Sequence, residues 1–155
     1  MSQAWLLDLG AGYRAAVGER ELVHLLYAPQ SYPVPRTPAH ARRVLPWQEH
    51  LLPVFDVVNW LGGALPPTGL PVAGIFAYQR GRGEMPQYGA LWLAAPPARL
   101  RVTDQQACDL PEPDSAWQAL AISCFEHEGT AVPILDLRRL YGTALGEHKQ
   151  PLQSP

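Results

Sequence analysis

A ten-residue segment occurs twice in this chain, at positions eighty residues apart. PVFDVVNWLG begins at Pro53, and PILDLRRLYG begins at Pro133. The copies share their proline, aspartate and glycine, and apolar residues match at the second, third, fifth and eighth positions. A unit that recurs in each half of a chain predicts two similar β lobes related by pseudo-symmetry. The alternative is a chance match among common residue types.

Proline and glycine limit the length of any element in the chain. Seventeen prolines and thirteen glycines in 155 residues divide it into short segments and argue against long helices. Hydrophobic residues make up 47% of the chain, enough for the core of one domain or of two small lobes. The composition therefore predicts a mostly β fold with short helices.

Apolar runs bounded by turn residues predict the strands. The chain is expected to open with a hairpin and to continue with strands in both halves, over residues 4–9, 13–17, 22–27, 50–55, 70–78, 88–94, 100–102, 119–125 and 131–135. Prolines between residues 29 and 38 predict a stiff, extended loop. Residues 144–155 are polar and unpatterned, which predicts a flexible tail.

Each copy of the repeat changes from strand periodicity to helical periodicity at its aspartate. After Asp56 the apolar residues fall three and four apart until Gly62, and the same spacing runs from Asp136 to Gly142. This pattern predicts a helix of one to two turns, with the aspartate as N-cap and the glycine at the C-terminal end. Asp56, Asp136, Gly62 and Gly142 are thus predicted to be structural helix caps.

The same two aspartates also suggest an enzyme of the aspartic-protease kind. Such an enzyme brings one carboxylate from each half together to share a proton. Its sites resemble Asp-Thr/Ser-Gly, whereas Val-Val follows Asp56 and Leu-Arg follows Asp136 in a helical pattern. Helix capping explains both residues better, so a protease that uses them stays a remote alternative and no enzymatic activity is predicted.

Other ligand classes have little support in the sequence. The net charge of −2 lacks the clustered basic excess with which proteins replace the counterions of nucleic acid. Cys124 and His127 are spaced like half of a zinc site, but no second pair of that kind exists. No cofactor or metal is therefore expected.

The two cysteines and the N-terminal segment bear on the cellular compartment. Cys108 and Cys124 have no disulfide-framework spacing and are expected to be free thiols, with Cys124 buried as a small hydrophobe. The first thirteen residues lack the pattern of a signal peptide, and no apolar stretch is long enough to cross a bilayer. We expect a cytoplasmic protein without membrane insertion.

The sequence around the first copy of the repeat resembles the CheW-type domain. In that family a V-P-x-x-P loop leads through an apolar stretch to Pro-Val-x-Asp and a short helix, as the chain does between Tyr32 and Gly62. The second copy, AVPILDLRRLYG, resembles the end of the same domain, and YGALWL and AWLLDL resemble two of its strands. The resemblance covers about residues 4–142.

The resemblance implies a pair of intertwined, SH3-like, five-stranded β-barrels. It gives a single CheW-like domain over residues 1–143, with one lobe at about 14–65 and the other at about 66–143. The N-terminal strand is a candidate to be shared between the lobes. Such a domain acts as a scaffold, or adaptor, that couples the cytoplasmic tips of chemoreceptors to the regulatory domain of a CheA-type histidine kinase, and it needs no active site.

The chain departs from the family pattern at two places. The usual Leu-Arg-Gly appears as Trp47, Gln48 and Glu49, and His24 stands where a glutamate is customary. Either a structural ion pair has become a His/Gln contact, or the partner-facing chemistry has changed. In the second case the chain is a divergent paralogue adaptor for another chemosensory output, such as twitching motility. The residues expected to bind protein partners are His24, Val44, Trp47, Gln48 and Glu49.

Overall fold

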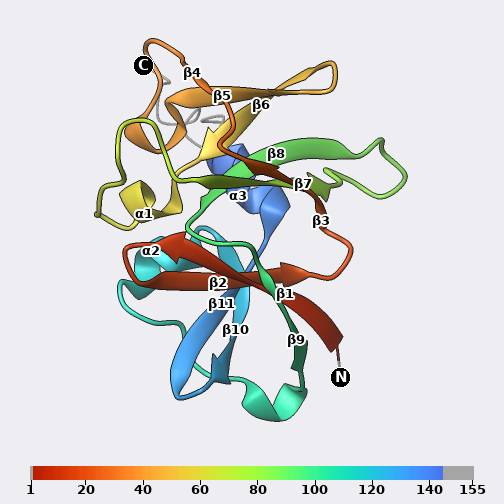
Figure 1. Cartoon of the computed structure of the whole chain (residues 1–155). Coiled ribbons are helices and arrows are strands. Elements are labelled where there is room, and N and C mark those ends of the chain that lie inside the picture. The colour runs from red at the N-terminus through yellow and green to blue at the C-terminus, as the bar shows by residue number, and fades with distance from the viewer. Residues whose placement is uncertain (1, 145–155) are drawn as a thin grey trace, which may run out of the picture.

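The computed structural model describes residues 2–144, and its strands form two sheets, one above the other in Figure 1. The fold is mostly β with short helices, as predicted. Of the predicted flexible tail at 144–155, all but the first residue lies outside the described part of the chain.

The first sheet contains five strands in the order β10, β11, β2, β1, β9. The strands are β1 (Ser2–Gly10), β2 (Tyr13–Gly18), β9 (Ala98–Val102), β10 (Ala121–His127) and β11 (Thr130–Leu135). Neighbours are antiparallel except β11 and β2, which are parallel. Strands from both ends of the chain therefore meet in one sheet.

The second sheet contains six strands in the order β3, β7, β8, β6, β5, β4. The strands are β3 (Leu22–Tyr27), β4 (Tyr32–Pro33), β5 (Arg43–Trp47), β6 (His50–Phe55), β7 (Val72–Tyr78) and β8 (Gln87–Leu93). Neighbours are again antiparallel, with the exception of the parallel pair β6 and β8. The short edge strand β4 has no counterpart in the first sheet.

Without β4, the two sheets have the same topology. The hairpin β5–β6 followed by β8, β7 and β3 matches the hairpin β10–β11 followed by β2, β1 and β9. Each sheet combines the first hairpin of one half of the chain, β1–β2 or β7–β8, with three strands of the other half, which are β9, β10 and β11 or β3, β5 and β6. The repeat therefore reports a real structural duplication whose two halves exchange their first hairpins.

This exchange corrects the lobe boundaries expected at about 14–65 and 66–143. Strand β2 lies in the first sheet with β9, β10 and β11, whereas β7 and β8 lie in the second sheet with β3, β5 and β6. The chain closes each hairpin locally, but the apolar faces of β1–β2 and β7–β8 are buried by strands far away in the sequence. Neither lobe is a continuous stretch of chain.

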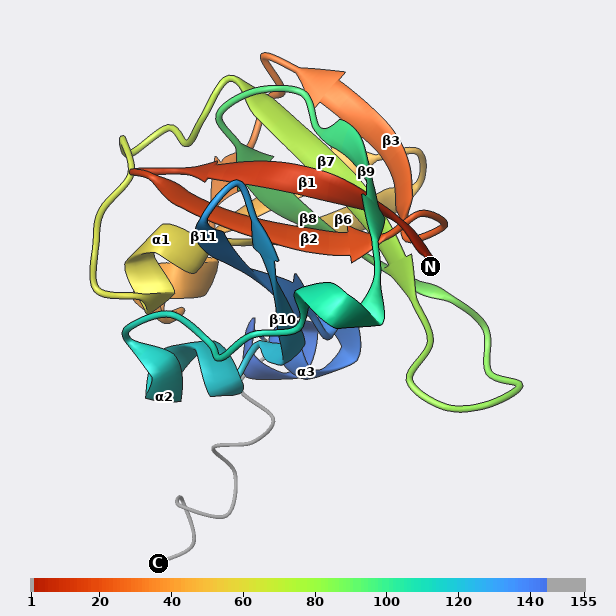
Figure 2. The same cartoon turned by 90° about the horizontal axis from the view of Figure 1, so that it is seen from below.

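Three helices lie near the boundary between the sheets (Figures 1 and 2). They are α1 (Val57–Trp60), α2 (Asp114–Gln118) and α3 (Leu137–Ala144), and two short 3-10 helices occur at Ala39–Ala41 and Asp104–Gln106. Helices α1 and α3 begin inside the two copies of the repeat, directly after Asp56 and Asp136, as predicted. The Trp60 Nε1 donates to the Ala116 carbonyl oxygen at 3.0 Å and joins α1 to α2.

The central core fills the space between the sheets. It combines residues of β1, β2, β6, β7 and β8 with all three helices, and includes Leu7, Leu9, Val17, Phe55, Phe76, Leu91, Trp117, Leu140 and Tyr141. A smaller apolar cluster lies on the opposite face of each sheet, around Ile75 in the second sheet and Phe125 in the first. Each sheet is thus apolar on both faces, as expected for two curled lobes packed together.

The first helix has the capped ends that its sequence predicts. The Asp56 carboxylate accepts a hydrogen bond from the Asn59 N–H at 2.9 Å. At the other end Gly62 has φ +98° and donates to the Asn59 oxygen, while Gly63 donates to the Val58 oxygen at 2.8 Å. These two bonds are the pair that closes a Schellman motif, in which glycine provides the left-handed residue.

The last helix differs from its prediction at Gly142. Asp136 precedes α3, and its carboxylate accepts from the Arg139 N–H at 3.3 Å, as expected of an N-cap. Gly142, however, lies inside α3, which continues to Ala144. Leu140 and Tyr141 are fully buried in the central core, and this packing outweighs the roughly 1 kcal/mol cost of an internal glycine.

Candidate protein-binding surface

The hairpin β5–β6 carries four of the residues expected to bind partners. Trp47 and His50 form its last cross-strand pair, and Gln48 and Glu49 make the exposed turn between them. Gln48 adopts φ +54°. The equivalent turn of the other lobe, eighty residues later, consists of Glu128 at φ +51° and Gly129 at φ +79°. The structural repeat therefore extends backwards into both hairpin turns, although their residues differ.

Four rings gather at one end of the second sheet, and we call them the aromatic end cluster: His24, Trp47, His50 and Tyr88. The Trp47 ring centroid lies 6.2 Å from His24, 6.2 Å from His50 and 5.2 Å from Tyr88. His50 and Tyr88 are themselves 5.5 Å apart. Trp47 and Tyr88 also pack on the apolar cluster of the second sheet, so the rings close one end of that lobe.

His24 therefore meets Trp47, and not Gln48 as the idea of a His/Gln contact required. Within residues 2–144 no hydrogen bond joins His24 to Gln48, whose side chain is exposed in the turn. The His24 ring is instead tilted by 37° against the Trp47 ring and belongs to the aromatic end cluster.

The opposite face of the same hairpin carries an exposed apolar group. We call it the outer patch, and it consists of Tyr32, Val44, Pro46, Leu51 and Pro53. Val44 pairs with both Tyr32 and Pro53, and Pro46 pairs with Leu51. Residues directly opposite in a sheet share a face, and so do residues two apart in one strand. Leu51 is 70% exposed and Tyr32 is 50% exposed.

Val44 is thus separated from the other predicted binding residues. Its side chain and that of Trp47 point to opposite faces of β5, because they are three residues apart. The outer patch continues along β6 to Phe55, which is buried in the central core. The structure therefore divides the predicted site between two faces of one hairpin.

Sequence reasoning missed Tyr32, Leu51, His50 and Tyr88. Strand β5 was not predicted, so the register that places Leu51 beside Pro46 and Trp47 beside His50 could not be derived. The alternation of residues 43–47 against 50–55 across a two-residue turn was the available signal. Tyr88 is brought into the aromatic end cluster by the pairing of β8 with β7 and β6, which links distant segments.

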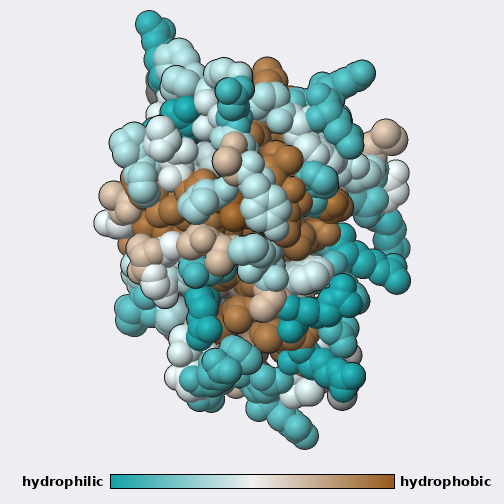
Figure 3. Space-filling view, in the orientation of Figure 1, coloured by the Kyte–Doolittle hydropathy of each residue, from teal (hydrophilic) through white to brown (hydrophobic). Residues whose placement is uncertain are grey.

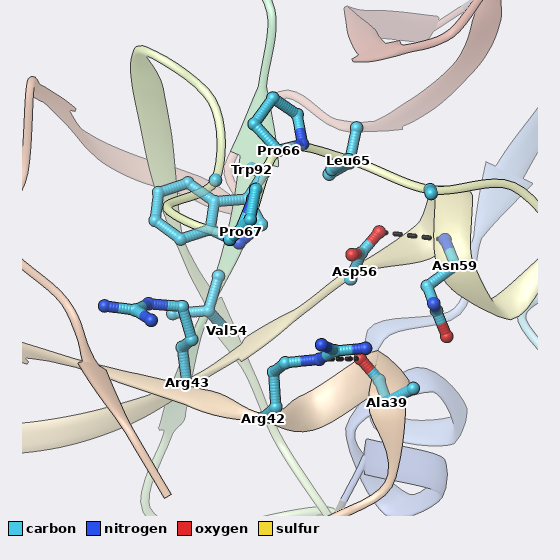
Figure 4. A pocket seen from close by; sticks show the side chains of 12 residues that line it. Ala39, Arg42, Arg43, Val54, Asp56, Asn59, Leu65, Pro66, Pro67 and Trp92 are labelled. Atoms are coloured by element: carbon cyan, nitrogen blue, oxygen red, sulfur yellow. Dashed lines mark hydrogen bonds between the residues drawn. The ribbon is translucent and has the colours of Figure 1, made fainter.

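A small cavity lies beside α1 on the second lobe (Figure 4). Its volume is about 150 Å³, and Arg42, Arg43 and Asp56 line it together with Trp92. Arg43 is already bound, since it donates to the Ser31 Oγ at 2.6 Å and to the Ser31 oxygen at 2.7 Å. These bonds hold the proline-rich loop against β5. The cavity is too small for a drug-sized ligand.

Asp56 does not form a catalytic pair with Asp136. Burial raises the pKa of the Asp56 carboxyl above its ordinary value, although the Asn59 N–H and the Arg42 guanidinium act in the other direction. Within residues 2–144 no hydrogen bond or ion pair connects the two carboxylates, and each accepts an N–H of its own helix. The geometry is that of two helix caps.

The remaining features of the described chain concern metal-binding groups and membrane-spanning helices. Residues 2–144 contain no group of histidine, cysteine and acidic side chains placed to hold a metal. Within the same residues, no helix combines the length and the apolar character needed to cross a bilayer. Apolar side chains do reach the surface, and Figure 3 shows them gathered in a band across the middle of one face, where the two sheets meet.

Comparison with known proteins relates the chain to others by fold alone. No family model and no curated protein matches the sequence. The structure is similar to that of the scaffolding protein TtCheW from Thermoanaerobacter tengcongensis, with a TM-score of 0.66 and 14% identity. The match covers 91% of this chain and 93% of that chain. The chain therefore has the CheW-like fold that its sequence motifs implied.

Proposed function

We propose that this chain is a non-enzymatic scaffold that couples chemoreceptors to a CheA-type histidine kinase in a bacterial chemosensory array in the cytoplasm. The observation that supports it most is a CheW-like fold over nearly the whole chain. The protein that shares the fold is itself described as a scaffolding protein. A scaffold needs binding surfaces and no reactive group, which agrees with two aspartates that serve as helix caps.

The outer patch is the surface that we assign to the kinase regulatory domain. Leu51 and Tyr32 expose large apolar areas, and burying such an area against a partner contributes about 25 cal/mol per Å². The patch includes Tyr32 of β4, the two-residue strand that ends the sheet. An apolar face next to a sheet edge suits a partner that is itself a β-rich lobe.

The hairpin turn is the surface that we assign to the receptor tip. Gln48 and Glu49 project from the end of the second lobe, and the aromatic end cluster supports them from below. Trp47 fixes the strand that precedes the turn, through its contacts with His50 and Tyr88. A rigid turn with polar side chains can select partners through the charges that it presents.

The first experiment measures binding to a purified CheA-type regulatory domain. We expect the two proteins to co-elute, and Leu51→Ser to weaken the complex by about tenfold or more, the scale of a hot-spot residue. Ile122→Ser is the matched control, because Ile122 is 61% exposed but lies on β10 in the other lobe. Absence of binding, or equal losses in both variants, would contradict the proposal.

A second candidate is a divergent adaptor for a different chemosensory output. It is favoured by the tilted contact between the His24 and Trp47 rings, because His24 lies where CheW-type domains have a glutamate. The triple variant His24→Glu, Gln48→Arg, Glu49→Gly should then bind a conventional receptor tip more tightly than the unmodified chain. Glu49→Gly alone separates turn geometry from charge, because glycine stands at the equivalent position 129. Unchanged receptor binding in the triple variant would rule out this candidate.

A further inference from the structure

Cys108 and Cys124 face each other across a short antiparallel pairing in the first lobe. Their Sγ atoms are 3.4 Å apart, and the Cys108 N–H donates to the Cys124 oxygen at 3.1 Å. The adjacent bridge joins Ala107 to Phe125. Residues directly opposite in an antiparallel pair have Cα atoms about 4.5–5.5 Å apart, which lies inside the range that disulfides span. The backbone is therefore already placed for a bond between the two sulfurs.

The two thiols differ in access to solvent. Cys124 is buried, whereas Cys108 is half-buried. Both line a surface cavity of about 590 Å³, whose wall also includes Leu110, Gln118 and Ile122. A cavity of this volume admits a small oxidant or a low-molecular-weight thiol to the Cys108 sulfur. Cys108 is thus the thiol that a reagent from solvent can reach.

The environment also gives the two thiols different reactivities. Burial, together with the neighbouring Cys108 thiol, raises the pKa of Cys124 to about 12. Because the thiolate is the nucleophile, Cys124 is a weak first attacker at neutral pH. The order of events follows from this, with Cys108 reacting first and Cys124 second.

We propose that Cys108 and Cys124 form a redox-active pair that a hydroperoxide converts into a reversible disulfide. The Cys108 sulfur attacks the peroxide oxygen and becomes a sulfenic acid, while the O–O bond breaks and water, or the alcohol of an organic peroxide, leaves. The Cys124 sulfur then attacks the sulfenic sulfur, its proton goes to the departing hydroxyl, and a second water leaves. Two thiols are oxidised by two electrons, and one peroxide is reduced.

The disulfide would tie the segment before β10 to the first sheet. The loop between the cysteines contains α2, which places Trp117 and Leu120 in the central core. Closing this loop restricts the unfolded chain, so the oxidised protein should melt roughly 5–10 °C higher than the reduced one. Oxidation thereby fixes the segment that links the first lobe to the core.

The test uses the full chain, reduced, freed of reductant and treated with a small excess of hydrogen peroxide. We expect both thiols to disappear, the intact mass to fall by two hydrogen atoms, and a peptide map to show Cys108 linked to Cys124. Dithiothreitol should restore both thiols and the lower melting temperature. Persistent sulfenic or sulfinic acid on Cys108 with a free Cys124 thiol would overturn the proposal, as would disulfides formed only between molecules.

Single variants test the order of the two steps. Cys124→Ser should leave a sulfenic acid on Cys108 that dimedone traps, because the second thiol is missing. Cys108→Ser should react with peroxide much more slowly, because Cys124 is buried and protonated. Equal rates in the two variants would contradict the assigned order. The mass and peptide map of the unmodified chain decide the existence of the pair even if a variant does not fold.

Discussion

The Tyr141 ring lies directly on the backbone of Gly89, so that a Cβ atom at Gly89 would clash with the Tyr141 Cζ. The Tyr141 hydroxyl passes this glycine and donates to the Ala90 carbonyl oxygen at 2.8 Å. Tyr141 belongs to α3 and Gly89 to β8, so this contact joins the end of the chain to the second sheet. The helix can reach the sheet here because position 89 has no side chain.

We predict that Gly89→Ala destabilises the protein by about 1–3 kcal/mol, the usual cost of an added carbon in a packed core. Urea unfolding monitored by circular dichroism measures it. Gly129→Ala is the control, since nothing lies within 4 Å of a Cβ there and only its φ of +79° disfavours alanine. That variant should lose about 1 kcal/mol. An equal loss in the two variants would show that the Tyr141 ring yields to the methyl group.

Tyr141→Phe should cost about 1–3 kcal/mol, because it leaves the buried Ala90 oxygen without its donor. Burial raises the pKa of Tyr141 well above its ordinary value of 10.0, so the hydroxyl stays a donor over the range of ordinary buffers. Tyr32→Phe provides the comparison, because its hydroxyl bond to Gln30 is exposed at 3.3 Å. Its unfolding midpoint should stay within error of the unmodified chain.

Removing either capping carboxylate should lower stability without removing a catalytic function. Asp56→Ala and Asp136→Ala are each expected to cost about 0.5–2 kcal/mol, with the smaller loss at Asp136, whose bond to the Arg139 N–H is longer. Asp56→Asn keeps an acceptor for the Asn59 N–H and should recover most of the loss. Unchanged stability combined with loss of a peptidase activity would instead support the aspartic-protease alternative.

Glu21 gives the protein a pH-dependent term in its stability. Burial raises the pKa of its carboxyl above the ordinary 4.5, although the Gly18 N–H bonds the carboxylate at 2.8 Å. The folded state therefore holds the proton more tightly than the unfolded state, and this favours folding below about pH 4.5. The contribution is lost as the pH rises through the folded-state pKa.

Glu21→Gln should abolish this loss, because glutamine stays neutral and can still accept the Gly18 N–H. We expect the variant and the unmodified chain to have nearly equal free energies of unfolding at acidic pH. The variant should become the more stable protein at pH 7. Urea titrations at a series of pH values test this, and parallel curves across the series would contradict it.

Local patterns were sufficient to predict much of the fold. The opening hairpin, the strand at 50–55 and the helix capped by Asp56 and Gly62 all appear where the sequence placed them. Each of these depends on neighbours within a few residues: alternating apolar side chains, a tight turn, or a cap. At Gly142 the local rule failed, because burial of Tyr141 outweighed the preference of glycine for a helix end.

Two elements that depend on contacts with residues distant in the sequence, β5 and α2, were not predicted. Strand β5 contains Pro46, and α2 has only five residues and follows Pro113. Both are stabilised by their surroundings, since Trp117 of α2 is buried in the central core. The spacing of Trp117 and Leu120 was a helical signal, although a weak one. The exchange of hairpins could not be derived, because alternation within a strand does not identify its partner.

The candidate site likewise has a part that the sequence indicated and a part that depends on strand pairing. The resemblance to CheW-type domains drew attention to His24 and to the turn at 47–49, and the structure does bring His24 to Trp47. It could not place Val44 on the other face of β5, where Leu51 is its most exposed neighbour. That placement depends on the register of the β5–β6 hairpin, which a single sequence specifies poorly.

The hairpin exchange determines when each lobe can form as the chain is synthesised. All strands of the second sheet are available once Leu93 has left the ribosome. The first sheet, in contrast, contains both β1 and β11, so it cannot be completed before Leu135 appears. The hairpin β1–β2 is therefore synthesised first, yet its sheet is completed last. The first lobe can close only after the second lobe has all of its strands.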